Sequence, residues 1–158
     1  MVERNESLGN LLFTVLVALL LTVIPLPHYV EMGRPAFLVL TVLYWSVAAP
    51  RLGGISLGFF SGLVLDLFRG AVLGQNALAL AAVTYIFVRE HQKIRLKPVF
   101  QQSLIVCGTL VIYEFILFVI DGWSGHPLTT PWRWLHAVIG AIIWPLVSVV
   151  LDRTRGAR

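Results

Sequence analysis

Six long apolar stretches, separated by short charged segments, constrain this chain more than any other feature of its sequence. They dominate the 158 residues because 58% of the chain is hydrophobic and only 13% is charged. A soluble domain usually carries about 25% charged residues, and a soluble globule of this composition would expose large apolar patches. The pattern therefore excludes an ordinary soluble enzyme and a disordered tail, and it indicates a protein that lies in a lipid bilayer.

The lengths of the stretches predict an all-α integral membrane protein, a compact bundle of six transmembrane helices that forms one domain over residues 1–158. A helix that crosses a bilayer needs about 20 apolar residues, which leaves no room for an added soluble domain. The expected spans are 8–26, 35–50, 52–68, 70–88, 98–120 and 132–151. The second and third are short, so a re-entrant pair over residues 35–66 is an alternative to two full spans.

The placement of basic residues predicts that the N and C termini are both cytoplasmic. Lys and Arg gather in cytoplasmic loops, and this orientation puts nine basic residues inside and three outside. The three outside residues are Arg34, Arg69 and Arg133. The nine inside residues are Arg4, Arg51, Arg89, Lys93, Arg95, Lys97, Arg153, Arg155 and Arg158. The net charge of +4 thus reflects topology rather than nucleic-acid binding. The basic cytoplasmic loop (residues 89–97) is expected to contact lipid headgroups, or to dock a cytoplasmic protein.

The tryptophans are expected to anchor helix ends at the two membrane surfaces, where indole rings prefer to lie. Trp123, Trp132 and Trp134 fall at the predicted outer boundary. Trp45 and Trp144 fall toward the inner ends of their spans.

Small residues recur every four positions through the third predicted span and beyond it. The row consists of Gly54, Gly58, Gly62, Asp66, Gly70 and Gly74, of which the first four are expected to share one helix. Residues four apart lie on one helix face, and small residues there let helices approach closely. The row predicts either a tight seam inside the bundle or a surface for a partner's transmembrane helix.

Three charges lie within or at the edge of predicted spans, where an ionised group is expensive and normally paired. Asp66 and Arg69 are three residues apart, so they are expected to form an ion pair or to cap a broken helix end. Glu114 lies near the outer end of the fifth span. Its expected partners are Arg69, Arg133 or His136. An ion or proton site is the alternative for each of these acids.

No motif in the sequence points to catalysis, a cofactor or a bound metal. The sequence has no phosphate-binding glycine loop with a lysine, no zinc-type motif and no serine–histidine–acid set. Its one cysteine, Cys107, excludes an intrachain disulfide and a cysteine-based metal site. The four histidines are scattered over both predicted sides of the membrane: His28, His91, His126 and His136. The chain is therefore expected to be no enzyme and to need no cofactor.

The segment 58–81, GFFSGLVLDLFRGAVLGQNALALA, resembles the signature of the rod shape-determining protein MreD family. The residues that carry the resemblance are Gly58, Gly62, Asp66, Leu73, Gly74, Ala77 and Leu78, with Pro35, Trp45 and residues 49–51. The resemblance implies a multi-pass protein of the bacterial inner membrane, similar in fold to the substrate-binding subunits of energy-coupling-factor vitamin transporters. It also implies partners, namely a bitopic MreC-like protein, a RodA-like glycosyltransferase, a penicillin-binding transpeptidase and the MreB filament.

The leading hypothesis is a non-enzymatic scaffold that binds the transmembrane helix of the MreC-like partner. The positions expected to pack helices or contact the partner are Gly54, Gly58, Gly62, Asp66 and Gly74. Membrane lipids and a second copy of the chain are further expected partners. The alternative is a small-molecule-binding membrane subunit of the vitamin-transporter type, with an outward pocket lined by Trp123, Trp132, Glu114 and His136. An ion or proton channel that relies on Asp66 and Glu114 is a third reading.

Overall fold

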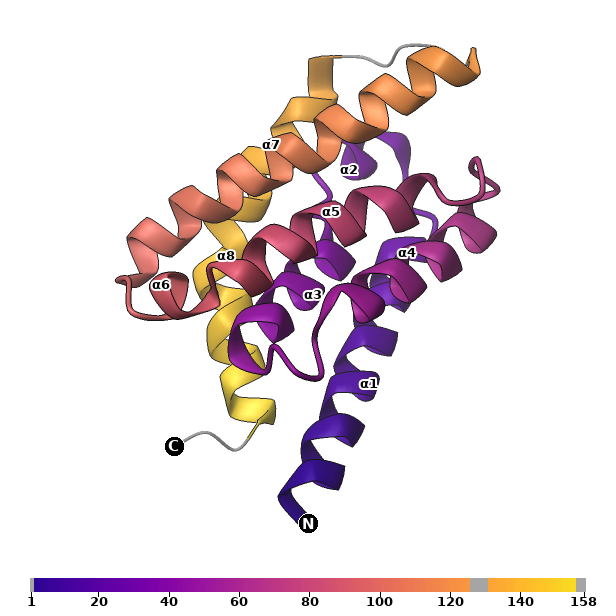
Figure 1. Cartoon of the computed structure of the whole chain (residues 1–158). Helices are drawn as coiled ribbons and strands as arrows, with labels where there is room; N and C mark the ends of the chain where they lie inside the picture. The colour runs from indigo at the N-terminus through magenta and orange to yellow at the C-terminus, as the bar shows by residue number, and fades with distance from the viewer. Residues whose placement is uncertain (1, 126–130, 156–158) are drawn as a thin grey trace.

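The computed structural model describes residues 2–125 and 131–155, and their side chains from residue 8 onward. The described chain is helical and contains no strand, which confirms the all-α prediction (Figure 1). The elements are α1 (Val2–Val23), α2 (His28–Glu31), α3 (Phe37–Ala48), α4 (Ile55–Arg69), α5 (Gln75–Arg89), α6 (His91–Arg95), α7 (Val99–Ser124), η1 (Pro131–Trp134) and α8 (Leu135–Thr154). Each of the six apolar stretches forms one of the longer helices. By length and composition, α7 and the stretch Pro131–Thr154 are the described helices that are long and apolar enough to cross a membrane.

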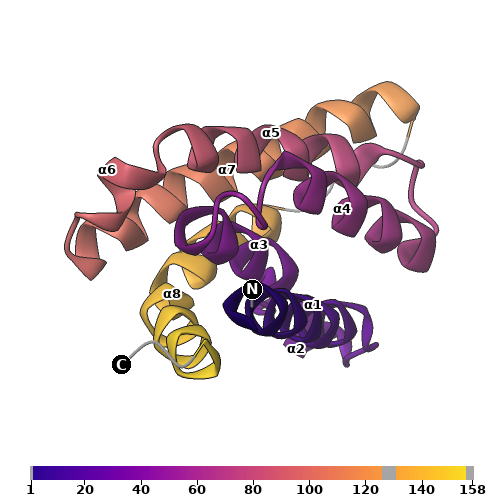
Figure 2. The same ribbon diagram turned by 60° about the horizontal axis from the view of Figure 1, so that its bottom comes forward.

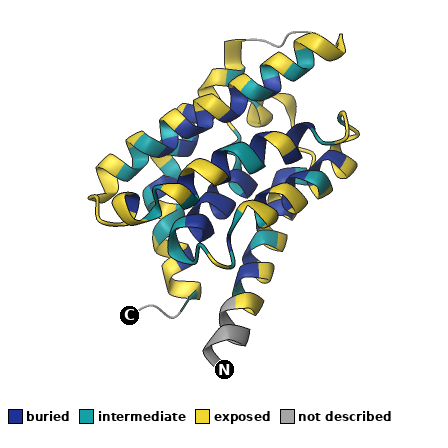
Figure 3. Cartoon of the chain, in the orientation of Figure 1, coloured by how far each residue is buried: buried dark blue, intermediate teal, exposed yellow. Residues whose placement is uncertain are grey.

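Helix α3 lies at the centre of the bundle because it is apolar on every side. Residues 38–46 are all buried, and the helix contacts α1, α4, α5, α6 and α8. A helix with one apolar stripe buries only that stripe, whereas a helix that is apolar all round is enclosed. Figure 3 shows the consequence, with buried residues gathered inside and exposed residues on the outward faces of the surrounding helices.

Two of the five tryptophans belong to this core, so the prediction that they anchor the inner membrane surface is wrong. Trp45 has no exposed surface, and Trp144 is 2% exposed. The Nε1 of Trp45 donates to Thr14 Oγ1 at 2.9 Å, and that of Trp144 donates to Gln102 Oε1 at 3.3 Å. Because each indole N–H finds an acceptor inside the bundle, these rings can be buried completely.

Helices α4 and α5 form an antiparallel hairpin around a turn that sequence reasoning placed inside a helix. Gly70 and Gly74 have positive φ angles of 61° and 95°, a region that glycine adopts without strain. Gly70 ends α4, and α5 begins at Gln75 rather than at residue 70 as predicted. The turn thus takes up the first residues of the predicted fourth span.

The start of α1 and the end of α8 lie at the same end of the molecule. Asn10 Nδ2 donates to the carbonyl of Thr154 at 3.0 Å. Figure 2 shows α1 and α8 below α3, with α4, α5 and α7 forming a layer above it.

Candidate functional site

The central glycines of the period-four row lie in the seam between α4 and α5. A Cβ atom at Gly62 would lie 2.6 Å from both the Cα of Ala77 and the carbonyl oxygen of Asn76, which are backbone atoms. A Cβ at Gly58 would lie 2.5 Å from Thr84 Oγ1. The two glycines therefore allow the two backbones to approach closely. The structure fills this seam with the chain's own α5.

The outer members of the row do not share that helix. Gly54 precedes α4 as its N-terminal flanking residue, so the prediction that it shares the helix with Gly58 is wrong. Gly74 flanks the start of α5. The sequence period is continuous here, but the turns at both ends of α4 break the helical register.

Asp66 is fully buried and caps the N-terminus of α5 from the end of α4. Its Oδ1 accepts from Asn76 N at 3.0 Å and Asn76 Nδ2 at 2.7 Å. Its Oδ2 accepts from Gly74 N at 3.0 Å and Ala77 N at 3.4 Å. The first N–H groups of a helix lack partners and attract negative charge, so this carboxylate satisfies them directly. Among the described residues no ion pair joins Asp66 to Arg69, and the acid serves as a helix cap.

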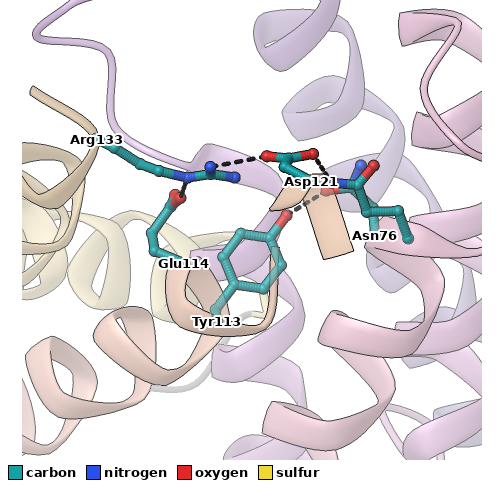
Figure 4. Close-up of polar contacts among 6 residues, drawn as sticks. Asn76, Tyr113, Glu114, Asp121 and Arg133 are labelled. Atoms are coloured by element: carbon teal, nitrogen blue, oxygen red, sulfur yellow. Dashed lines mark hydrogen bonds and ion pairs between the residues drawn. The ribbon is translucent and has the colours of Figure 1, made fainter. Parts of the chain in front are cut away.

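The capped end of α5 is also tied to α7 by polar side chains. Tyr113 donates to Asn76 Oδ1 at 2.5 Å, and Gln75 Nε2 donates to Asp121 Oδ1 at 2.5 Å. Figure 4 shows Asn76, Tyr113 and Asp121 lying close together. Buried polar groups that are all paired fix the relative position of the helices that carry them.

Arg133 completes this network from η1. Its Nε lies 2.8 Å from Glu114 Oε2, and its Nη1 lies 2.8 Å from Asp121 Oδ2 (Figure 4). All three side chains are largely buried, with 13%, 9% and 17% exposed for Arg133, Glu114 and Asp121. Of the three partners expected for Glu114, the structure selects Arg133. A guanidinium between two carboxylates supports a structural pairing of this acid.

Beside the network lies a cavity of about 620 Å³ that is open at the protein surface, and we call it the outward cavity. Its walls come from the end of α1, from α2, the start of α3, the end of α4, the middle of α7, and η1 with the start of α8. The three arginines predicted to lie outside the membrane all line it: Arg34, Arg69 and Arg133. The three basic residues that the charge pattern predicted to lie outside therefore line the same cavity.

Three of the four residues expected to line an outward pocket do so, namely Trp132, Glu114 and His136. Trp123 is not among the lining residues and is 92% exposed at the end of α7. The cavity is lined by both cationic and acidic side chains and by apolar walls. It can hold an amphiphilic ligand with a polar or charged end.

A second hollow of about 290 Å³ lies between α1 and α8, and we call it the α1–α8 groove. The lining residues are Phe13, Thr14, Val17, Ala18, Leu21, Phe37, Thr41, Ile143, Leu146, Val147, Val150, Leu151 and Thr154. Small buried residues of α1 and α3 form its floor, and exposed aliphatic residues form its rims. Such a surface suits an apolar helix or acyl chain.

The basic loop over residues 89–97 contains the short helix α6, which is held to the core by Ile94. Lys93 Nζ lies 2.7 Å from Glu90 Oε2, and Arg89 Nε lies 3.9 Å from Glu90 Oε1. The hydrogen bond and charge of Lys93 lower the pKa of the partly exposed Glu90 carboxyl. Arg95 and Lys97 are exposed, so the loop keeps its basic character.

Sequence reasoning missed Asn76, Tyr113 and Asp121 as members of the network. One signal was present, since Gln75 and Asn76 are a polar pair directly before the apolar residues of α5. Polar residues in that position are expensive in a membrane unless they are paired. Within residues 2–125 and 131–155, no group of three or more His, Cys, Asp or Glu side chains is arranged to hold a metal ion.

Comparison with known proteins gives a consistent result over nearly the whole chain. The family described as rod shape-determining protein MreD matches residues 6–154. The rod shape-determining protein MreD of Haemophilus influenzae is 32% identical over 151 residues, which cover 90% of this chain and 91% of that relative. No solved structure matches the chain.

Proposed function

Because this chain belongs to the rod shape-determining protein MreD family, we propose that it is a scaffold that holds the bacterial cell-elongation complex together in the inner membrane. Family membership gives it a role in the rod-shape determining system. The family is one of shape-determining membrane proteins and is no known enzyme family. The scaffold therefore acts through contacts rather than chemistry.

The scaffold is a multi-pass domain over residues 1–158, with six spans and both termini cytoplasmic. Exposed aliphatic side chains on the outward faces of α7 and α8, such as Leu104 and Ile142, support this placement in lipid. Helices α3, α4 and α5 have 12 to 15 residues, which is shorter than the hydrocarbon core requires. Local thinning of the bilayer or help from neighbouring helices compensates for short helices. We also propose that this six-helix arrangement is similar in fold to the substrate-binding subunits of the vitamin transporters.

The transmembrane helix of an MreC-like bitopic protein lies in the α1–α8 groove. This is the observation that carries the proposal: α5 already fills the glycine seam, whereas the apolar groove between α1 and α8 is open. Its floor has the small residues Thr14, Ala18 and Thr41, which let a helix approach closely. The effect of Gly58, Gly62 and Asp66 on the groove is indirect, because they set the shape of the α4–α5 hairpin that packs on α3.

Further members of the complex join through the MreC-like partner or by direct contact. They are a RodA-like glycosyltransferase, a penicillin-binding transpeptidase and the MreB filament. The exposed basic residues of the cytoplasmic loop give a surface for the filament or for anionic lipids. A second copy of the chain competes with the MreC-like helix for the groove.

Affinity purification from bacterial membranes, followed by mass spectrometry, tests the scaffold. Val17→Trp and Val150→Trp fill the groove from its exposed rims and replace no buried residue. Leu104→Trp, on an exposed face of α7, is the matched control. We expect the wild type and the control to recover an MreC-like protein and the groove variants to lose it. Equal recovery with all variants, each shown to unfold at the wild-type temperature, would contradict the proposal.

The outward cavity favours a second candidate, a small-molecule-binding subunit of the vitamin-transporter type. Its volume of about 620 Å³ falls within the range of ligand sites, about 300–1,000 Å³. Native mass spectrometry of the purified chain distinguishes the two. A single tightly held metabolite, without a protein partner, would favour this candidate over the scaffold.

A further inference from the structure

Two of the three arginines in the outward cavity have no carboxylate partner. Arg34 Nη1 donates to the carbonyl of Ile24 at 2.7 Å, but its Nε is buried and has no hydrogen-bond partner in the described part of the chain. Arg69 forms no hydrogen bond or ion pair with any residue in the described ranges, and it is exposed at the end of α4. Arg133, in contrast, is held by Glu114 and Asp121.

The two guanidiniums without a carboxylate partner affect each other electrostatically. Burial and the nearby charge of Arg69 lower the pKa of Arg34, and only part of this effect is offset by Glu31. Glu31 lies at the cavity without an ion pair to either arginine within residues 2–125. Like charges that lie near each other repel. A buried N–H without an acceptor adds a further cost. An anion between the two arginines would offset their repulsion.

The walls of the cavity indicate what kind of anion fits. Ile24 and Phe68 line it, and they are apolar residues that are 48% and 62% exposed. Trp132, which is half-exposed, also lines the cavity, and indole rings favour the membrane surface. A ligand that satisfies both the arginines and these walls carries a negative head and an apolar body.

We infer that Arg34 and Arg69 bind the phosphate group of a phospholipid whose acyl chains leave the cavity past Ile24 and Phe68. A phosphate suits this pair because its oxygens accept in-plane hydrogen bonds from the fork of N–H groups on each guanidinium. The site is separate from the α1–α8 groove, since the two cavities share no lining residue. The inference therefore goes beyond the scaffold and does not depend on a protein partner.

Native mass spectrometry of the full chain in detergent tests the inference with four defined probes. Phosphatidylglycerol carries the phosphate and the chains, dioleoylglycerol carries the chains alone, and inorganic phosphate carries the head alone. A synthetic acidic peptide represents a protein segment. We expect one phosphatidylglycerol to bind per chain, more tightly than the other three probes. Arg34→Gln and Arg69→Gln should each weaken it by about tenfold.

The exposed Arg51, which does not line the cavity, gives the control variant Arg51→Gln with unchanged binding. Arg69→Gln removes no hydrogen bond among the described residues, so it should unfold at the wild-type temperature and keep the test independent of folding. Wild-type binding by both variants, or equal binding of dioleoylglycerol, would overturn the site. Inorganic phosphate binding as tightly as the lipid would assign the same arginines to free phosphate and overturn the lipid. Displacement of the lipid by the acidic peptide would assign them to protein and refute the lipid.

Discussion

A methyl group added at Gly62 tests the closest contact in the α4–α5 seam. In Gly62→Ala the new Cβ would lie 2.6 Å from Ala77 Cα and Asn76 O, which cannot move away by a change of rotamer. Ordinary contact begins near 3.4 Å, so α4 and α5 must separate by about 1 Å, and overpacking of this kind costs about 1–3 kcal/mol. The upper end of this range applies because a shift of Asn76 and Ala77 would also disturb their hydrogen bonds to Asp66.

The gain in helix propensity from replacing glycine by alanine opposes this cost and must be measured separately. Gly108→Ala supplies that measurement, because Gly108 lies within α7 and a Cβ added there would meet no atom within 4 Å. We expect Gly108→Ala to gain up to about 1 kcal/mol and Gly62→Ala to fall below it by about 1–3 kcal/mol. Denaturant titration of each purified variant in detergent, followed by tryptophan fluorescence, gives both values. Equal stability of the two variants would refute the tight seam.

The remaining predictions concern the buried polar groups and the tryptophans. Asp66→Ala should lower stability by about 2 kcal/mol, because it removes a helix cap and leaves buried N–H groups unpaired. Asp66→Asn should cost less, and an equal loss for both would count against the cap. Glu114→Gln and Arg133→Gln should show a coupling energy of about 1–3 kcal/mol in a double-mutant cycle, whereas additive effects would disprove the ion pair. Trp45→Phe should destabilise the protein by about 1–3 kcal/mol through a lost buried contact. Trp123→Phe should change its stability by less than about 0.5 kcal/mol, and thermal unfolding of both compares the core with the surface.

The longer helices could be predicted from the sequence because hydropathy reports burial in lipid or protein directly. The ends of the helices could not, because they depend on individual φ angles, as at Gly70 and Gly74. The four-residue spacing of the glycine row continues through the turns at both ends of α4. The spacing alone therefore predicted a helix that begins too early, at Gly54. The burial of Trp45 could not be predicted either. An indole prefers a membrane interface unless an acceptor inside the bundle, here Thr14, pairs with its N–H.

The candidate site was predictable only as a set of expensive charges that needed partners. The position of Glu114 along the predicted span reduced its expected partners to three residues. The packing of η1 brings Arg133, one of the three, to its carboxylate. Asp66 was identified, but its role as a cap depends on the hairpin, which brings residues 74–77 to its carboxylate. The α1–α8 groove could not be predicted, because it forms between helices from opposite ends of the chain.

Site-specific photo-cross-linking tests most directly whether the chain acts by holding a partner's helix in the α1–α8 groove. A cross-linking residue at Leu146, on the exposed rim of the groove, is compared in living bacteria with one at Leu104, on the exposed face of α7. We predict that position 146 captures an MreC-like bitopic protein and that position 104 does not. Capture at 104 alone, or capture of only a second copy of the chain at 146, would contradict the account.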